Sequence, residues 1–99
     1  MICDWDPAKA TSNFVKHGVE FRDAATVFMD PLAVTYTDPD HSYDESREIT
    51  IGRTIEQGLV FVSHNWRGDQ LRIIGARFAT RSERKQYEEG SNRSRRKQP

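Results

Sequence analysis

Residues 59–89 concentrate the side chains that could do chemistry in this chain. An unperturbed histidine titrates near neutral pH and can give or take a proton. An arginine stays charged and presents a planar guanidinium that suits oxyanions. Basic and aromatic residues follow one another closely along this segment: His64, Trp66, Arg67, Arg72, Arg77, Arg81, Arg84, Lys85 and Tyr87. These residue types predict a surface that meets an anion, with a proton-transfer group beside it.

A β-hairpin followed by a helix would position these side chains. Residues 59–64 and 71–77 are rich in β-branched and aromatic residues, and the polar corner at 65–69 contains a glycine, as longer hairpin loops do. Thr80 and Glu83 have the spacing of a capping box, which predicts a helix directly after the second strand. The sequence therefore predicts strand, turn, strand and helix without a linker.

The period of a strand decides which basic residues share a face. Strict alternation places Arg47 on the face of Ile49, but it places Arg72 and Arg77 on opposite faces of their own strand. The basic residues can all share a face only if a bulge interrupts the strand or the strand ends splay apart. We expect that irregularity at Gly75.

Two helices and two strands precede the hairpin. Asp6 and Pro7 predict a helix over residues 7–16, and apolar residues at helical spacing predict a second over 21–28. Alternating residues predict strands over 32–37 and 47–52. The expected fold class is α+β, with two N-terminal helices, a four-stranded, mostly antiparallel sheet and a C-terminal helix.

Size and composition limit the possible functions. A chain of 99 residues with 35% apolar residues predicts one domain over residues 1–89 and a disordered basic tail over 90–99. The core is too small for a large cofactor, and we expect none. The lone Cys3 leaves no pair for a disulfide or for zinc. With no apolar run of membrane-spanning length, we expect a soluble cytoplasmic protein that does not contact a membrane.

Charge divides unevenly along the chain although the total is zero. Residues 1–45 carry three bases against nine acids, and residues 46–99 carry twelve bases against six acids. Such asymmetry suggests that the basic half contacts nucleic acid. Charges that are simply solvated would give the same pattern, so this alternative stays open.

An acidic loop offers a metal-binding alternative. Asp38, Asp40 and His41 lie close together and could ligate a cation. Turns commonly use Asp and Pro for backbone reasons, and the sequence has no second ligand cluster. We therefore expect no metal site.

Four short motifs lie in a fixed order along nearly the whole ordered chain. They are Trp5-Asp6-Pro7-Ala8-Lys9-Ala10 with Asn13; Lys16-His17-Gly18-Val19 with Phe21, Ala24 and Phe28; Arg47-Glu48-Ile49-Thr50-Ile51-Gly52; and Leu71-Arg72-Ile73-Ile74-Gly75-Ala76-Arg77 with Ala79-Thr80, Glu83-Arg84 and Tyr87. Their order and spacing resemble the BrnT family of ribonuclease toxins. The family usually has a serine where Gly75 stands, so no hydroxyl role is carried over to that position.

This resemblance implies a fold and a function. The fold would be RelE-like, and the activity a metal-independent endoribonuclease that cleaves RNA and halts translation. The partner would be a BrnA-like antitoxin with a DNA-binding domain, in a tight hetero-oligomeric complex.

RNA cleavage without a metal uses the ribose 2′-hydroxyl as a nucleophile on the adjacent phosphate. The protein must remove one proton, supply another and stabilise the added negative charge. We predict that Arg72 and Arg77 stabilise that charge and that His64 or His17 transfers a proton, with Tyr87 as a further candidate. Substrate binding is assigned to basic residues and to an aromatic that could stack on a splayed base: Lys16, His17, Arg47, Trp66 and Arg67.

Each predicted role has a structural alternative. Arg72 and Arg77 could pair with Glu83 and Glu88 to hold the last helix. Arg47 could pair with Glu45, Trp66 could cover the edge of the core, and His17 could simply close its helix.

Two other functions remain possible at this stage. The protein could be a non-catalytic module that binds nucleic acid or protein through its basic hairpin. It could also be a metal-dependent nuclease that uses Asp38, Asp40 and His41.

Overall fold

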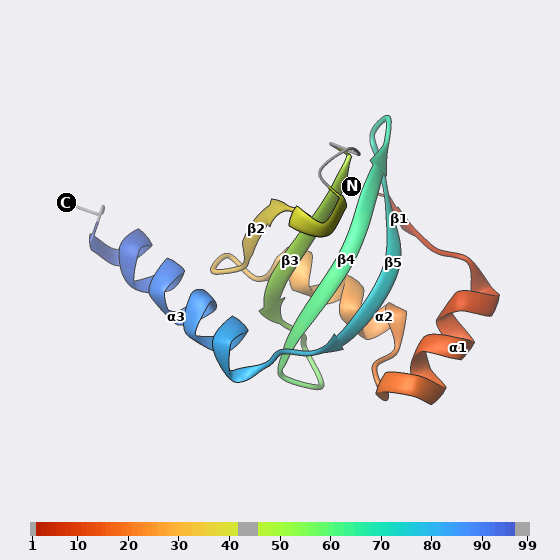
Figure 1. The fold of residues 1–99 in the computed structure, drawn as a ribbon, viewed down its shortest axis with the longest axis horizontal. Helices are drawn as coiled ribbons and strands as arrows, with labels where there is room; N and C mark the ends of the chain where they lie inside the picture. Colours follow the sequence, from red (N-terminus) through yellow and green to blue (C-terminus); the bar gives the residue numbers. More distant parts are fainter. Residues whose placement is uncertain (1, 42–45, 97–99) are drawn as a thin grey trace.

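The computed structural model describes residues 2–41 and 46–96. Within them, five strands form one sheet in the order β1-β5-β4-β3-β2 (Figure 1). The strands are β1 (Ile2–Asp4), β2 (Val34–Thr37), β3 (Arg47–Arg53), β4 (Leu59–Arg67) and β5 (Gln70–Phe78). Neighbouring strands are antiparallel except β1, which is parallel to β5.

The sequence predicted a four-stranded sheet, and the sheet of the described residues has one strand more. The missing strand is β1, whose three residues pair with Gln70, Leu71 and Arg72 of β5. Three residues are too few to show a period of two, so only the pairing with β5 defines this strand. The expected α+β class is confirmed.

The N-terminal helices lie where the sequence predicted them. Helix α1 (Pro7–His17) begins with Ala8 N donating to Asp6 Oδ1 at 2.9 Å, and it ends at Gly18, whose φ of 74° is the left-handed conformation that glycine tolerates. Helix α2 (Phe21–Ala24) continues as the 3-10 helix η1 (Ala25–Met29). In Figure 1, α2 passes behind the sheet and α1 stands beside its β1–β5 edge.

Helix α3 (Arg81–Arg96) begins with the predicted capping box. Thr80 N donates to Glu83 Oε1 at 2.9 Å, and Glu83 N donates to Thr80 Oγ1 at 3.2 Å. The helix continues to Arg96, through the segment for which we expected disorder. A glycine inside a helix costs only about 1 kcal/mol relative to alanine, so Gly90 does not stop it. A Cβ at Gly90 would lie 2.8 Å from Val34 Cγ2, so glycine lets α3 pass close to β2.

The two faces of the sheet are covered differently. The larger core lies between the sheet and the N-terminal helices and contains Val19, Phe21, Ala24, Val27, Val60, Val62, Leu71, Ile73 and Ala76. We call this side the helix-covered face. A smaller cluster on the opposite side contains Ile49, Ile51, Leu59 and Tyr87 and lies beneath α3. None of the described helices is long and apolar enough to cross a membrane.

Strand β5 contains the irregularity that the sequence predicted near Gly75. The register shifts between Ser63 and His64 of β4, which leaves Ile74 without a partner opposite it. The extra residue is a β-bulge, and it reverses the alternation of the residues beyond it. Arg72 and Arg77 consequently lie on the same side of the sheet, opposite the helix-covered face.

Candidate functional site

Four polar residues form a row across the sheet on the side away from the N-terminal helices. Arg47 of β3 faces Asn65 of β4, Asn65 faces Arg72 of β5, and Arg72 faces Asp4 of β1. Directly opposed residues in neighbouring strands lie about 5 Å apart at Cβ, so their side chains adjoin. We call Asp4, Arg72, Asn65 and Arg47 the polar row.

Both arginines of the row are held by a carboxylate at one nitrogen. Arg72 Nε lies 3.5 Å from Asp4 Oδ1, and Arg47 Nε lies 3.6 Å from Asp38 Oδ2. Their side chains are 32% and 27% exposed. Within the part of the chain that is described, neither guanidinium makes a hydrogen bond, so both retain donors for an oxyanion.

The middle of the row has unused hydrogen-bonding capacity. Asn65 Oδ1 and Ser63 Oγ are buried and have no hydrogen-bond partner among residues 2–41 and 46–96. Buried polar atoms are nearly always paired, so these two on the same face of β4 indicate a place for a ligand or for water. His64 Nδ1, on the opposite face of the strand, is the third unpaired buried atom of β4 among the described residues. Neither residue was predicted to belong to a site, although the alternation of β4 places both on the face of Leu59 and Phe61.

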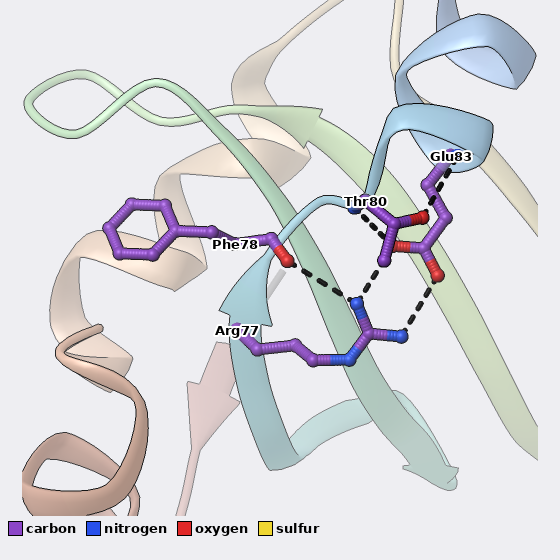
Figure 2. A network of polar contacts seen from close by, with 4 residues as sticks. All are labelled: Arg77, Phe78, Thr80 and Glu83. Carbon is purple, nitrogen blue, oxygen red and sulfur yellow. Dashed lines mark hydrogen bonds and ion pairs between the residues drawn. The ribbon is translucent and has the colours of Figure 1, made fainter.

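Arg77 lies on the same side but is bound to α3 (Figure 2). Its two terminal nitrogens donate to the two carboxylate oxygens of Glu83, each at 2.8 Å, and Nη1 also lies 3.3 Å from the Phe78 carbonyl oxygen. Its Cζ lies 3.9 Å from the centre of the Phe61 ring. The hydrogen bonds to Glu83 raise the pKa of Arg77. The structural alternative is thus confirmed for Arg77, whereas Arg72 pairs with Asp4 and not with a glutamate of α3.

His64 lies on the helix-covered face, away from the polar row. Its Nε2 lies 2.8 Å from Thr50 Oγ1, which in turn lies 2.7 Å from Thr35 Oγ1. The centres of the His64 and Phe28 rings are 5.0 Å apart, and the rings meet edge to face. The side chain is 1% exposed, and burial lowers its pKa to about 4. A neutral imidazole on the far side of the sheet has no path to an anion on the row. This geometry therefore gives no support to the predicted proton transfer by His64.

Tyr87 fixes α3 to the rest of the fold. Its hydroxyl donates to Asp30 Oδ2 at 2.8 Å, and Arg53 Cζ lies 5.6 Å from the ring centre. The residue is 4% exposed, and burial together with the bond to Asp30 raises its pKa. The geometry explains Tyr87 as a packing residue and does not place it at the polar row.

The remaining predicted binding residues lie at the edges of the sheet. Lys16 and His17 line a shallow groove of about 360 Å³ that also contains Ile74 of the β5 bulge. Helix α1 is fixed there by Asn13, which accepts from Ala76 N at 3.1 Å and donates to the Ala76 carbonyl at 2.9 Å. Lys16 is exposed and His17 is half-buried.

The hairpin corner carries two further predicted binding residues. Trp66 Nε1 donates to Glu48 Oε1 at 2.8 Å, and 39% of the residue is exposed. Arg67 is exposed beside it. Trp66 lies two residues from His64 and bonds Glu48, which faces His64, so its partly exposed ring is fixed toward the helix-covered side and not toward the polar row.

The acidic loop is organised by backbone hydrogen bonds. Asp38 Oδ1 accepts from Asp40 N at 3.0 Å, in the turn role expected for Asp. The side chain of His41 lies outside the described residues. Over the part of the structure that is described, no three His, Cys, Asp or Glu side chains gather around a possible metal position.

The fold and the polar row define a small α+β protein with two partly exposed arginines on one face of its sheet. The model of the family described as "Ribonuclease toxin, BrnT, of type II toxin-antitoxin system" matches residues 5–83. The chain therefore belongs to the BrnT family of ribonuclease toxins.

A solved structure agrees with this assignment at the level of the fold. The crystal structure of the Brucella abortus ribonuclease toxin BrnT superposes with a TM-score of 0.64 at 22% sequence identity, covering 82% of this chain and 100% of that one. No curated protein matches the chain.

Proposed function

We propose that this protein is a metal-independent endoribonuclease toxin with a RelE-like fold that cleaves RNA at the polar row and thereby inhibits translation. The observation that carries the proposal is the pair of partly exposed arginines on either side of Asn65, each held through Nε by an aspartate. The family assignment supports RNA as the substrate.

The chemistry requires charge stabilisation more than any other contribution. The 2′-oxygen attacks the adjacent phosphorus and the bond from phosphorus to the 5′-oxygen breaks, which leaves a 2′,3′-cyclic phosphate and a 5′-hydroxyl. One proton leaves the nucleophile, and a solvent water supplies one to the departing 5′-oxygen. Arg47 and Arg72 donate to the phosphorane oxygens, where the negative charge increases. Asp4 is the more exposed carboxylate beside these arginines, and because it lies across β5 from Asn65 it accepts the nucleophile's proton through bridging water.

The other predicted residues support this site from its surroundings. Lys16, His17 and Arg67 attract the RNA backbone, and Trp66 stacks on a base only where the RNA passes around the hairpin corner to the other side of the sheet. Arg77 positions α3 through Glu83. His64, fixed between Thr50 and Phe28, keeps β4 in place beneath the row.

The partner we propose is a BrnA-like antitoxin with a DNA-binding domain, whose acidic segment covers the polar row. An enzyme that destroys RNA must be silenced where it binds phosphate, and a carboxylate is the protein group that competes for a guanidinium. Expression of the toxin alone should stop growth and bulk translation, and co-expression of the antitoxin should restore both. If a folded toxin expressed alone leaves translation unaffected, this proposal is wrong.

The deciding experiment is single-turnover cleavage of a defined RNA in excess EDTA. Arg72→Ala and Arg47→Ala are compared with Arg22→Ala, which removes an equal charge from a side chain that is 86% exposed on α2. We expect cleavage by the parent and by Arg22→Ala, and strongly reduced cleavage by the two row variants. Loss of cleavage in EDTA would support a metal-dependent nuclease. RNA binding by a parent protein that never cleaves would support the non-catalytic module.

A further inference from the structure

Ser63 and Asn65 lie two residues apart on β4, on the same side as the arginines of the polar row. Ser63 Oγ and Asn65 Oδ1 are buried without a hydrogen bond to any described residue. Leaving a buried polar atom unpaired costs about 1–3 kcal/mol. Two such atoms at the centre of a candidate site are consistent with groups that are paired only when substrate is bound.

The chemistry of these atoms limits what they can bind. Asn65 Oδ1 can only accept a hydrogen bond, so it requires a donor and does not favour an anionic oxygen. The Ser63 hydroxyl can donate and accept. A phosphate between Arg47 and Arg72 takes up their guanidinium donors, which leaves the amide oxygen of Asn65 to accept from a donor attached close to that phosphate.

RNA carries such a donor at a fixed place. The ribose 2′-hydroxyl is both donor and acceptor, and it is the group by which a protein distinguishes RNA from DNA. It is joined to the 3′-phosphate through two ribose carbons, so it lies nearer to a bound phosphate than the exocyclic amines of the base do. A phosphate on the arginines would thus bring the 2′-hydroxyl to the middle of the row.

We propose that Asn65, together with Ser63, binds the 2′-hydroxyl of the nucleotide whose 3′-phosphate lies on Arg47 and Arg72. The hydroxyl donates to Asn65 Oδ1, and the Ser63 hydroxyl donates to the 2′-oxygen. The two residues thereby select RNA over DNA and orient the nucleophile. This inference rests on the proposed function, because it takes the polar row as the phosphate site.

Access and rigidity are both consistent with this role. Arg47 and Arg72 are partly exposed and make no hydrogen bonds to described residues, so they can turn onto a phosphate and uncover the amide between them. The strand itself is held firmly, because His64, between Ser63 and Asn65, is bonded to Thr50 and packed edge-on against Phe28. The binding atoms are therefore fixed while the groups beside them can move.

The test uses nucleotides that contain no bond to cleave. Adenosine 3′-monophosphate and its 2′-deoxy analogue are titrated into the full-length protein by calorimetry, and the ratio of their dissociation constants is compared between variants. We expect the parent to prefer the ribonucleotide by about three- to tenfold, the range of one net hydrogen bond. Asn65→Ala should bring the ratio close to one.

Three further variants separate ribose recognition from other effects. Asn65→Asp keeps the acceptor oxygen, so it should retain the preference while weakening both nucleotides through repulsion of their phosphate. Arg72→Ala should weaken both nucleotides alike and keep the ratio. Gln57→Ala, which removes an exposed amide from the turn before β4, should change neither value.

The outcomes distinguish the two proposals. Equal binding of both nucleotides by the parent, or an unchanged ratio in a folded Asn65→Ala variant, overturns ribose recognition while leaving the phosphate site in place. No measurable binding of either nucleotide at millimolar concentration, or no effect of Arg72→Ala, overturns the polar row as the phosphate site and with it both proposals.

Discussion

Strand β4 supplies side chains to two faces of one sheet with opposite chemical character. On the helix-covered face, His64 is bonded to a threonine and held neutral by burial, which lowers its pKa to about 4. On the other face, Ser63 and Asn65 lie beside arginines that cannot readily lose their charge. A histidine that loses its charge on burial becomes a core residue, whereas an arginine keeps its charge wherever the fold places it. Residue type alone therefore does not locate the chemistry.

The arginine-bearing side contains a second contrast. The terminal nitrogens of Arg77 are bound to Glu83 at 2.8 Å, whereas Arg72 meets Asp4 only through Nε at 3.5 Å. Both arginines lie on the same side of β5, but both terminal nitrogens of Arg77 are bound to Glu83, whereas those of Arg72 make no hydrogen bond among the described contacts. We infer that Arg72 belongs to the site and that Arg77 supports it.

The largest expected effect is the loss of cleavage in Arg72→Ala. Removing one preorganised donor to developing charge should lower the single-turnover rate by about two to three powers of ten. The free energy of unfolding should change little, because the side chain is partly exposed and its ion pair is weak. Rates at saturating protein, with circular dichroism for folding and Arg22→Ala as the charge-matched control, test this. If folded Arg72→Ala cleaves at the rate of the parent protein, Arg72 does not belong to the site and does not differ from Arg77 in function.

The next largest effect is a loss of folding stability at acid pH, caused by His64 on the helix-covered face. An unfolded histidine titrates near pH 6.5, and His64 in the fold titrates near 4, since burial outweighs the opposing charge of Glu48. Between these values the unfolded chain binds more protons, so stability rises with pH and is lost as pH falls from about 6.5 to 4. We expect a loss of about 2–3 kcal/mol between pH 7 and 4.5.

Urea unfolding of the parent and of His64→Gln at both pH values measures this contribution. The variant carries no imidazole and should lack most of that loss, whatever its stability at pH 7. If the two proteins lose stability equally, His64 is not the group that titrates. If His64→Gln also abolishes cleavage while folded, the histidine acts in the chemistry after all.

Arg77→Ala should act mainly on stability. Breaking a bidentate pair that is intermediate between exposed and buried should cost about 2 kcal/mol, because Glu83 is left largely buried without its partner. Arg84→Ala, which removes an exposed arginine from the same helix, is the matched control. Urea unfolding gives the stability and single-turnover kinetics give the rate. A rate loss as large as that of Arg72→Ala, in a folded protein, would place Arg77 in the site.

Tyr87→Phe should give the smallest effect, a destabilisation of about 1 kcal/mol from one lost hydrogen bond. The carboxylate of Asp30 keeps its bonds from the Leu32 and Arg53 amides, so no charge is left unpaired. Tyr36→Phe, on the same side of the sheet, serves as the control for removing a tyrosine hydroxyl. Thermal unfolding measures both. A folded Tyr87→Phe protein that has lost cleavage by powers of ten would restore the catalytic role predicted for this residue.

Local features of this protein could be predicted from its sequence because their causes are local. Asp6 and Gly18 bound α1, and Thr80 and Glu83 start α3, since each satisfies backbone groups only a few residues away. An irregularity at Gly75, one residue from the observed bulge, was also predicted, because Arg72 and Arg77 are five positions apart and strict alternation would place them on opposite faces.

Only the tertiary structure decided which of these residues form the candidate site. Residues 59–62 are apolar at every position, so alternation could not tell which side of β4 the helices cover or that His64 faces them. Asp4 reaches Arg72 only because β1 pairs with β5. The guanidinium of Arg77 is bound to Glu83, and so is not free for an anion, only because the first turn of α3 brings Glu83 back to β5. These contacts join segments that are far apart in the sequence or that are separated by a reversal of the chain direction. A period of two or 3.6 residues orders side chains within one element, but the packing of elements determines what each side chain meets.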